Sequence, residues 1–79
     1  MKERAIVEAA LFSAGRPLSV AELARATRLE EGTMKGHLRA LAREYAERES
    51  AIGVAQIGTK WTMQIRQDYA ERARAFAPP

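Results

Sequence analysis

The stretch from residue 19 to 45 predicts two amphipathic helices joined by a short turn, and the rest of the chain must cover them. Ser19 is followed three residues later by Glu22, which is the spacing of a capping box at a helix start. In that motif the serine hydroxyl accepts a hydrogen bond from the glutamate N–H, and the glutamate side chain accepts one from the serine N–H. The first of the two helices is therefore predicted from Ser19 to about Thr27. Its apolar face holds Val20, Leu23 and Ala24.

The second helix of this pair is predicted to start near Glu30 or Glu31 and to end among residues 47–50. The positive end of the helix dipole stabilises acidic side chains at the start of the helix. Its core-facing stripe follows the i, i+4, i+7, i+8, i+11 spacing of a buried helix face. The residues on this stripe are Met34, Leu38, Leu41, Ala42 and Tyr45. Residues 26–29, between the helices, have about the length of a helix-turn-helix turn.

A helix over residues 2–14 precedes this pair and presents a broad apolar face. Phe12 widens that face, so we expect its ring to anchor the helix in the core. Gly15 suits the left-handed residue that ends many helices, and Pro17 prevents further helical turns.

After residue 50 the hydrophobic period changes to the alternation of strands. The runs 52–57 and 60–66 flank Gly58-Thr59 and predict a two-stranded hairpin with a tight turn. The inward face of the second strand is expected to hold Trp61, Met63 and Ile65. Asp68 is predicted to cap a last helix, which residues 77–79 stop. The inward residues of that helix are expected to be Tyr69, Ala73 and Phe76.

The order helix, helix, helix, hairpin, helix is that of a winged helix-turn-helix domain. We predict one such domain over residues 1–79, mainly α (α+β), with three helices, a two-stranded wing and a C-terminal helix. Residues 31–47 take the position of the recognition helix. A chain of 79 residues buries a small core, so self-association or a partner would stabilise it.

Composition excludes several classes of protein. The chain has no cysteine, which excludes disulfides and thiolate metal sites. No apolar run approaches the roughly 20 residues that span a bilayer, and no secretory signal opens the sequence, so we expect a cytoplasmic protein. The net charge of +3 permits contact with nucleic acid, but ten acidic residues are interspersed among thirteen basic ones.

No motif of an enzyme or a metal site stands out. His37 is the single histidine, and without a cysteine or a second histidine a metal site lacks ligands. Ser13 and Ser19 have no histidine base at a recognisable spacing, which leaves nucleophilic catalysis unsupported. We therefore expect no catalytic residue, no metal and no cofactor.

A row of basic residues on the helix over 31–47 allows two interpretations. In the first, the chain is a DNA-binding winged-helix regulator whose basic side chains contact phosphates. These side chains would be Lys35, Arg39, Arg43, Lys60 and Arg66. In the second, the row is a solvated face with salt bridges. Around this helix, glutamates outnumber basic residues by five to four, and no Asn or Gln is present to read adenine, which weakens the DNA interpretation.

Gly32 and Gly36 lie four residues apart on the same helix. They either let another backbone approach closely or are tolerated weak points, each costing roughly 1 kcal/mol relative to alanine. Trp61 is favoured as a core residue because an alternating strand needs one buried face. An exposed part of its ring would instead suit an interface.

Five segments together suggest a family. Residues 6–27, IVEAALFSAGRPLSVAELARAT, run from a helix into an Ala-Leu-Phe-x-Ala-Gly-x-Pro-Leu-Ser segment. Further similarity lies in 41–48 (LAREYAER), 54–58 (VAQIG), 61–66 (WTMQIR) and 68–70 (DYA). Over nearly its whole length the chain resembles the N-terminal winged-helix domain of segregation and condensation protein B. That family supplies the kleisin-binding accessory subunit of prokaryotic SMC (structural maintenance of chromosomes) complexes.

The resemblance implies a non-enzymatic scaffold that forms a homodimer and acts in chromosome condensation and segregation. Its implied partners are a kleisin subunit and an SMC ATPase at the nucleoid. Apart from the resemblance, any contact with nucleic acid is expected to be weak or indirect. The family's usual protein has two winged-helix domains, the second expected to grip the kleisin, whereas this chain has room for one. The family's Thr-Gly-Leu-Ser turn is also replaced here by Thr27-Arg28-Leu29-Glu30.

We expect the dimer or partner interface on the first helix, the wing and the two glycines. The residues of this predicted interface are Ala5, Ala9, Phe12, Gly32, Gly36 and Trp61.

Overall fold

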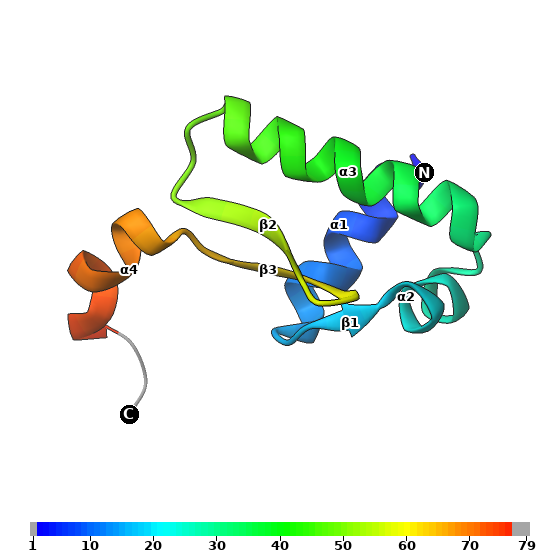
Figure 1. The fold of residues 1–79 in the computed structure, drawn as a ribbon, viewed down its shortest axis with the longest axis horizontal. Helices are drawn as coiled ribbons and strands as arrows, with labels where there is room; N and C mark the ends of the chain where they lie inside the picture. Colours follow the sequence, from blue (N-terminus) through cyan, green and yellow to red (C-terminus); the bar gives the residue numbers. More distant parts are fainter. Residues whose placement is uncertain (1, 77–79) are drawn as a thin grey trace.

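The computed structural model describes residues 2–76 and has the architecture of a winged helix-turn-helix (Figure 1). The predicted order of three helices, a hairpin and a last helix is confirmed, with one short strand added. The predicted stop at residues 77–79 lies outside the described residues. The elements are α1 (Glu3–Ala14), β1 (Leu18–Ser19), α2 (Val20–Thr27), α3 (Glu31–Glu47), β2 (Ile52–Ile57), β3 (Lys60–Ile65), α4 (Gln67–Ala73) and the 3₁₀ turn η1 (Arg74–Phe76).

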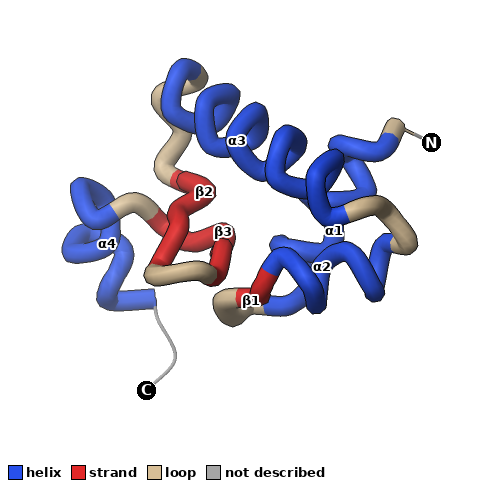
Figure 2. The backbone as a smooth tube through the Cα atoms, turned by 45° about the vertical axis from the view of Figure 1, so that its right-hand side comes forward, coloured by secondary structure: helices blue, strands red, loops and turns tan. Residues whose placement is uncertain are grey.

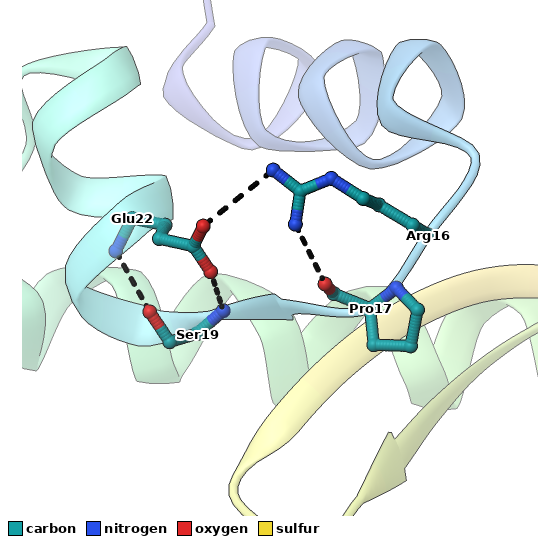
Figure 3. Close-up of polar contacts among 4 residues, drawn as sticks. All are labelled: Arg16, Pro17, Ser19 and Glu22. Atoms are coloured by element: carbon teal, nitrogen blue, oxygen red, sulfur yellow. Dashed lines mark hydrogen bonds and ion pairs between the residues drawn. The ribbon is translucent and has the colours of Figure 1, made fainter.

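Helix α2 begins with the predicted capping box (Figure 3). The Glu22 N–H donates to the Ser19 Oγ over 3.0 Å, and the Ser19 N–H donates to a Glu22 carboxylate oxygen over 2.9 Å. Arg16 adds an ion pair to the other carboxylate oxygen at 3.5 Å. The Ser19 backbone N–H is the largest cause of a lowered pKa at Glu22, because that hydrogen bond favours the charged carboxylate.

The helix-turn-helix turn is closed by Arg28, whose φ of 62° lies in the left-handed region. This is the position where such turns often carry glycine, and an arginine there holds a conformation that residues with a Cβ adopt rarely. The Leu29 N–H donates to the Ala24 carbonyl over 3.2 Å, which ends α2.

The core lies where α1, α2 and α3 meet the inner face of the sheet. The predicted α3 stripe is confirmed, with Met34, Leu38 and Leu41 buried and Ala42 and Tyr45 packed beside them. The buried apolar residues are Val7, Leu11, Leu18, Leu23, Met34, Leu38, Leu41, Val54 and Trp61.

The sheet has the order β1-β3-β2, so β3 is the central strand. All pairings are antiparallel, with Val54 opposite Met63 and Gln56 opposite Trp61. The sequence did not predict β1, because two residues are too few to show a period. β1 pairs with the start of β3 through Leu18 opposite Trp61 and Ser19 opposite Lys60.

Two predictions about core residues are wrong. Phe12 is 77 % exposed, because it lies about 100° around α1 from the buried Leu11 and points to the side of the core. Ile65, expected on the inner face of β3, is 37 % exposed. It lies at the far end of the strand, beyond the area that the helices cover.

The last helix also departs from prediction. Its N-cap is Arg66, without a side-chain hydrogen bond, and Asp68 lies inside the first turn. Of the three side chains expected to face inward, Tyr69 is 41 % exposed and Phe76 is 90 % exposed, while Ala73 is partly buried. Helix α4 lies at one end of the molecule, with the hairpin between it and α2 (Figures 1 and 2), and buries no residue.

Candidate protein-interaction surface

The solvent-facing side of α1 carries an apolar row, which we call the α1 stripe and define as Ala5, Ala9 and Phe12. Val7 and Leu11 on the opposite side of the helix are 0 % and 1 % exposed, and they fix which face is turned to water. All three stripe residues are exposed. The spacing i, i+4, i+7 places them along one line of a helix. The stripe is therefore an apolar helix face that no element among residues 2–76 covers.

A shallow hollow lies at the N-terminal end of this stripe. It has a volume of about 430 Å³ and is lined by Lys2, Ala5, Ile6 and Ala9. The small side chains of Ala5 and Ala9 form the hollow, while the Phe12 ring projects at the other end. One helix face thus holds both a projection and a depression.

Polar contacts hold the flanks of α1 against α3. Arg4 pairs with Glu44 at 2.5 Å, and the Tyr45 hydroxyl donates to a Glu8 carboxylate oxygen. That hydrogen bond is the main cause of a raised pKa at Tyr45, because the neighbouring carboxylate favours the protonated phenol. These contacts fix the orientation of α1 and leave the α1 stripe facing outward.

A second apolar surface, the sheet-end groove, joins the stripe at Phe12. Its volume is about 330 Å³. The groove is lined by Phe12, Tyr45, Ile52, Met63, Gln64 and Ile65. None of these side chains is charged. Sequence reasoning assigned Phe12, Met63 and Ile65 to the core and so missed this surface, which forms where the core ends.

The basic residues of the DNA interpretation separate into different places. Lys35 and Arg39 line a groove of about 410 Å³ between α3 and the wing, together with Gln56, Thr59 and the acidic Glu31. Arg43 is exposed on α3 outside that groove.

The side chains of the other two basic residues do not line that groove. Lys60 pairs with Ser19 across the sheet and helps to lower the pKa of Glu22. Arg66 lies at the opposite end of the hairpin, paired with Asp68 at 3.6 Å. The five residues therefore do not form one basic patch.

The remaining predicted interface residues differ in accessibility. Gly32 and Gly36 face open space, with nothing within 4 Å of an added Cβ. Trp61 is 8 % exposed and belongs to the core, as the favoured interpretation predicted, so little of its ring is available to a partner.

Neither a metal-binding cluster nor a membrane-spanning helix is found among residues 2–76. No three His, Asp or Glu side chains converge there as a metal site would require. No helix in the same range combines the length and apolarity needed to cross a membrane.

Solved structures of other proteins have a fold similar to that of this chain. The crystal structure of a dimer of the ScpB N-terminal domain complexed with ScpA peptide matches with a TM-score of 0.82 and 27 % identity, over 96 % of this chain and 88 % of that one. ScpB from Mycobacterium tuberculosis matches with a TM-score of 0.85 and 24 % identity, over 94 % of this chain and 46 % of that one.

A conserved hypothetical protein from Chlorobium tepidum matches with a TM-score of 0.77 and 18 % identity, over 98 % of this chain and 49 % of that one. The present chain thus spans about half the length of these last two proteins, and their low identities show the fold alone.

Sequence comparison adds the family. No curated protein matches the chain significantly. The family model described as segregation and condensation complex subunit ScpB matches residues 5–79. Because that match covers nearly the whole sequence, the chain belongs to the family of the segregation and condensation complex subunit ScpB.

Proposed function

We propose that this protein is a non-enzymatic scaffold module of an SMC–kleisin complex, acting in chromosome condensation and segregation at the nucleoid in the cytoplasm. It forms a homodimer through the α1 stripe and binds the kleisin subunit. Family membership supports the assignment to this complex. The similar N-terminal domain that was crystallised as a dimer with an ScpA peptide supports both kinds of contact.

The observation that carries the dimer proposal is the self-complementary shape of the α1 stripe. Phe12 and Ala5 lie seven residues apart, about two helical turns. If two copies of α1 cross antiparallel near Ala9, the Phe12 ring of each copy enters the hollow at Ala5 of the other. A two-fold axis requires each surface to be complementary to itself in this way.

Sedimentation velocity at several concentrations tests the dimer. The unchanged chain is expected to associate in the micromolar range, and Phe12→Ala to weaken association by about 30-fold, as removal of a central aromatic anchor does. The size exchange Ala5→Phe with Phe12→Ala moves the projection and the hollow to each other's positions and should restore part of the affinity. Phe76→Ala, which removes another highly exposed ring from the 3₁₀ turn η1, is the control. A chain that stays monomeric to high micromolar concentration would refute self-association.

Affinity capture of the kleisin from the same organism tests the second contact. The full chain should retain the kleisin, and the kleisin should bring the SMC ATPase with it. Deletion of the gene should produce anucleate cells or unsegregated nucleoids. Normal nucleoids in such a strain would contradict the role in chromosome segregation.

A second candidate function is DNA binding through the groove between α3 and the wing. The observation that favours it is that Lys35 and Arg39 share this groove and take part in none of the ion pairs found within residues 2–76. Glu31 in the same groove reduces its positive charge. DNA binding that weakens steeply with salt, and is lost with Lys35→Glu and Arg39→Glu, would support this candidate.

A further inference from the structure

The central strand β3 is covered along only part of its length on the side of β1. β1 pairs with Trp61 and Lys60 at the start of β3, while β2 pairs with every residue of it. Pro17 precedes β1, and a proline has no N–H with which to continue the ladder. In Figure 1 the half of β3 nearest α4 has β2 along one side and no strand along the other.

The main-chain groups on this open side can be identified from one hydrogen bond. The Arg66 N–H donates to the Ala51 carbonyl over 2.6 Å, so Arg66 points towards the β2 side. N–H and C=O groups alternate along an antiparallel strand, so Ile65 and Met63 point to the other side. No strand lies opposite them there, and the turn, loop and cap bonds within residues 2–76 do not use their main chain.

The open edge borders the sheet-end groove, whose wall includes the side chains of the same two residues. Met63 and Ile65 form one side of the groove, and Phe12, 77 % exposed, forms another. Proteins usually protect a free strand edge with a charged side chain, a proline or a bulge. The groove residues include no charge, so this edge is left open beside an apolar surface.

We propose that the open edge of β3 and the sheet-end groove form one site, which binds an extended segment of the kleisin as an added strand. This proposal rests on the proposed function, which supplies the kleisin as partner. The main chain of the segment pairs with the N–H and C=O groups of Met63 and Ile65. Alternate side chains of a strand point to one face, so every second residue of the segment enters the groove beside Phe12.

The chemistry of the edge favours an extended chain as the occupant. A row of main-chain donors and acceptors along a strand matches the spacing of another extended main chain, whereas the main-chain groups of a helix are already hydrogen-bonded to one another. The lining selects apolar side chains at every second position of that segment. The similar N-terminal domain was crystallised as a dimer complexed with ScpA peptide, which supports a peptide as the occupant.

Amide hydrogen exchange measured by NMR tests the proposal. The isotope-labelled chain is titrated with the full-length kleisin of the same organism, and then with overlapping peptides that cover it. The Met63 and Ile65 amides should exchange at least about tenfold more slowly at saturation, because both become hydrogen-bonded. The Gln64 amide points towards β2 and is the internal control, with little change expected.

Two variants at one position separate the main-chain contact from the side-chain contact. Ile65→Ala removes most of the apolar side chain and keeps the N–H, whereas Ile65→Pro also removes the N–H and obstructs an added strand. Because the Ile65 N–H points away from β2, neither variant removes a bond between β2 and β3. Ile65→Pro should bind the kleisin at least about tenfold more weakly than Ile65→Ala, the loss expected when a pairing edge is blocked.

The outcomes distinguish the inference from the proposed function. If the kleisin binds while the Met63 and Ile65 amides exchange as before, or if the two Ile65 variants bind equally, the edge site is refuted and the scaffold proposal stands. If those amides become protected as the chain is concentrated without kleisin, the occupant is a second copy and the inference is overturned. If the kleisin does not bind at all, the partner contact proposed for the scaffold fails, and this inference fails with it.

Discussion

The body of the protein, formed by α1, α2, α3 and the sheet, contrasts with its C-terminal end, formed by α4 and η1. In the body each helix buries at least one side chain below 2 % exposure, and the buried residues form a single cluster. Helix α4 also carries apolar residues at helical spacing, but it buries none, and Phe76 is 90 % exposed. The same kind of pattern therefore gives a packed helix in one region and an unpacked one in the other.

The difference arises from what lies opposite each apolar face. Periodic apolar residues show that a helix has a face to cover, but they do not identify what covers it. In the body α1, α2 and the sheet meet around α3 and cover one another. Helix α4 follows β3 outward, beyond the end of the sheet (Figure 2), where no other element of the described chain covers it. The α1 stripe is an intermediate case, since one face of that helix is buried and another is exposed.

The largest loss of stability is expected for a substitution at the centre of the body, and it would sharpen this contrast. Leu38→Ala removes a side chain with 0 % exposure and leaves a cavity, so it should lower the free energy of unfolding by about 2–5 kcal/mol. Urea denaturation followed by circular dichroism measures the change. A loss below about 1 kcal/mol would mean that the body relaxes around the cavity and is packed less tightly than described.

The sequence predicted the body well because its signals are local. The capping box at Ser19 needs two side chains three residues apart, and the α3 stripe needs a period that a single helix already displays. The hairpin follows from two alternating runs around Gly58. These features require no knowledge of distant contacts. Arg28 could not be predicted in the same way, because its left-handed backbone is imposed by the meeting of α2 and α3.

The candidate site was predicted less completely than the fold. Ala5, Ala9 and Phe12 were predicted as interface residues from the resemblance, yet periodicity alone also assigned Phe12 to the core. The sheet-end groove depends on where the hairpin extends past α1, which is a tertiary fact with no local signature. The two residues of β1 pair with only the start of β3 and leave its second half without a strand on that side within residues 2–76, and a strand that short shows no period. A sequence signal was nevertheless present, since Pro17 directly before β1 limits how far that strand can pair.

The next largest difference in stability between the two regions is expected from substitutions at the starts of their helices. Ser19→Ala removes the hydroxyl that accepts from Glu22 and should cost about 1 kcal/mol of stability. Helix α4 has no side-chain cap, so Asp68→Ala in its first turn should cost less than about 0.5 kcal/mol. Thermal unfolding of both variants gives the comparison. Equal losses would show that α4 contributes to the cooperative fold as much as α2 does.

A smaller loss of stability is expected at the hydrogen bond that joins α1 to α3. Tyr45→Phe removes the hydrogen bond to Glu8 and should cost about 0.5–1 kcal/mol, since the contact is partly exposed to solvent. The pKa of Tyr45 is raised above its ordinary value of 10.0, so its contribution is complete below about pH 10 and is lost as the pH rises through the raised pKa. The stability of the unchanged chain should therefore fall more than that of the variant on alkaline titration. Parallel curves would indicate that the hydroxyl does not bond to Glu8 in solution.

Acid titration should show a still smaller contribution from the capping box. The lowered pKa of Glu22 means that its stabilising effect is present above about pH 4.5 and is lost as the pH falls through the folded-state pKa. Glu22→Gln keeps an oxygen that can accept from the Ser19 N–H but carries no charge to titrate. The melting temperature of the variant should consequently fall less between pH 6 and pH 3 than that of the unchanged chain. An identical fall would place the acid sensitivity elsewhere in the body.

The smallest effect is expected in η1, the turn that follows α4, and it tests the contrast between the two regions most directly. Phe76→Ser replaces an aromatic ring that is 90 % exposed, and the ring touches no part of the core. Surface substitutions of this kind change stability by less than about 0.5 kcal/mol, so the unfolding curve of the chain at low concentration should hardly move. Repeating the measurement with kleisin bound separates two explanations of the exposed ring. If the variant then loses stability that the unchanged chain gains, the apolar face of α4 is covered in the complex, and the two regions differ only in whether their partner lies in the same chain.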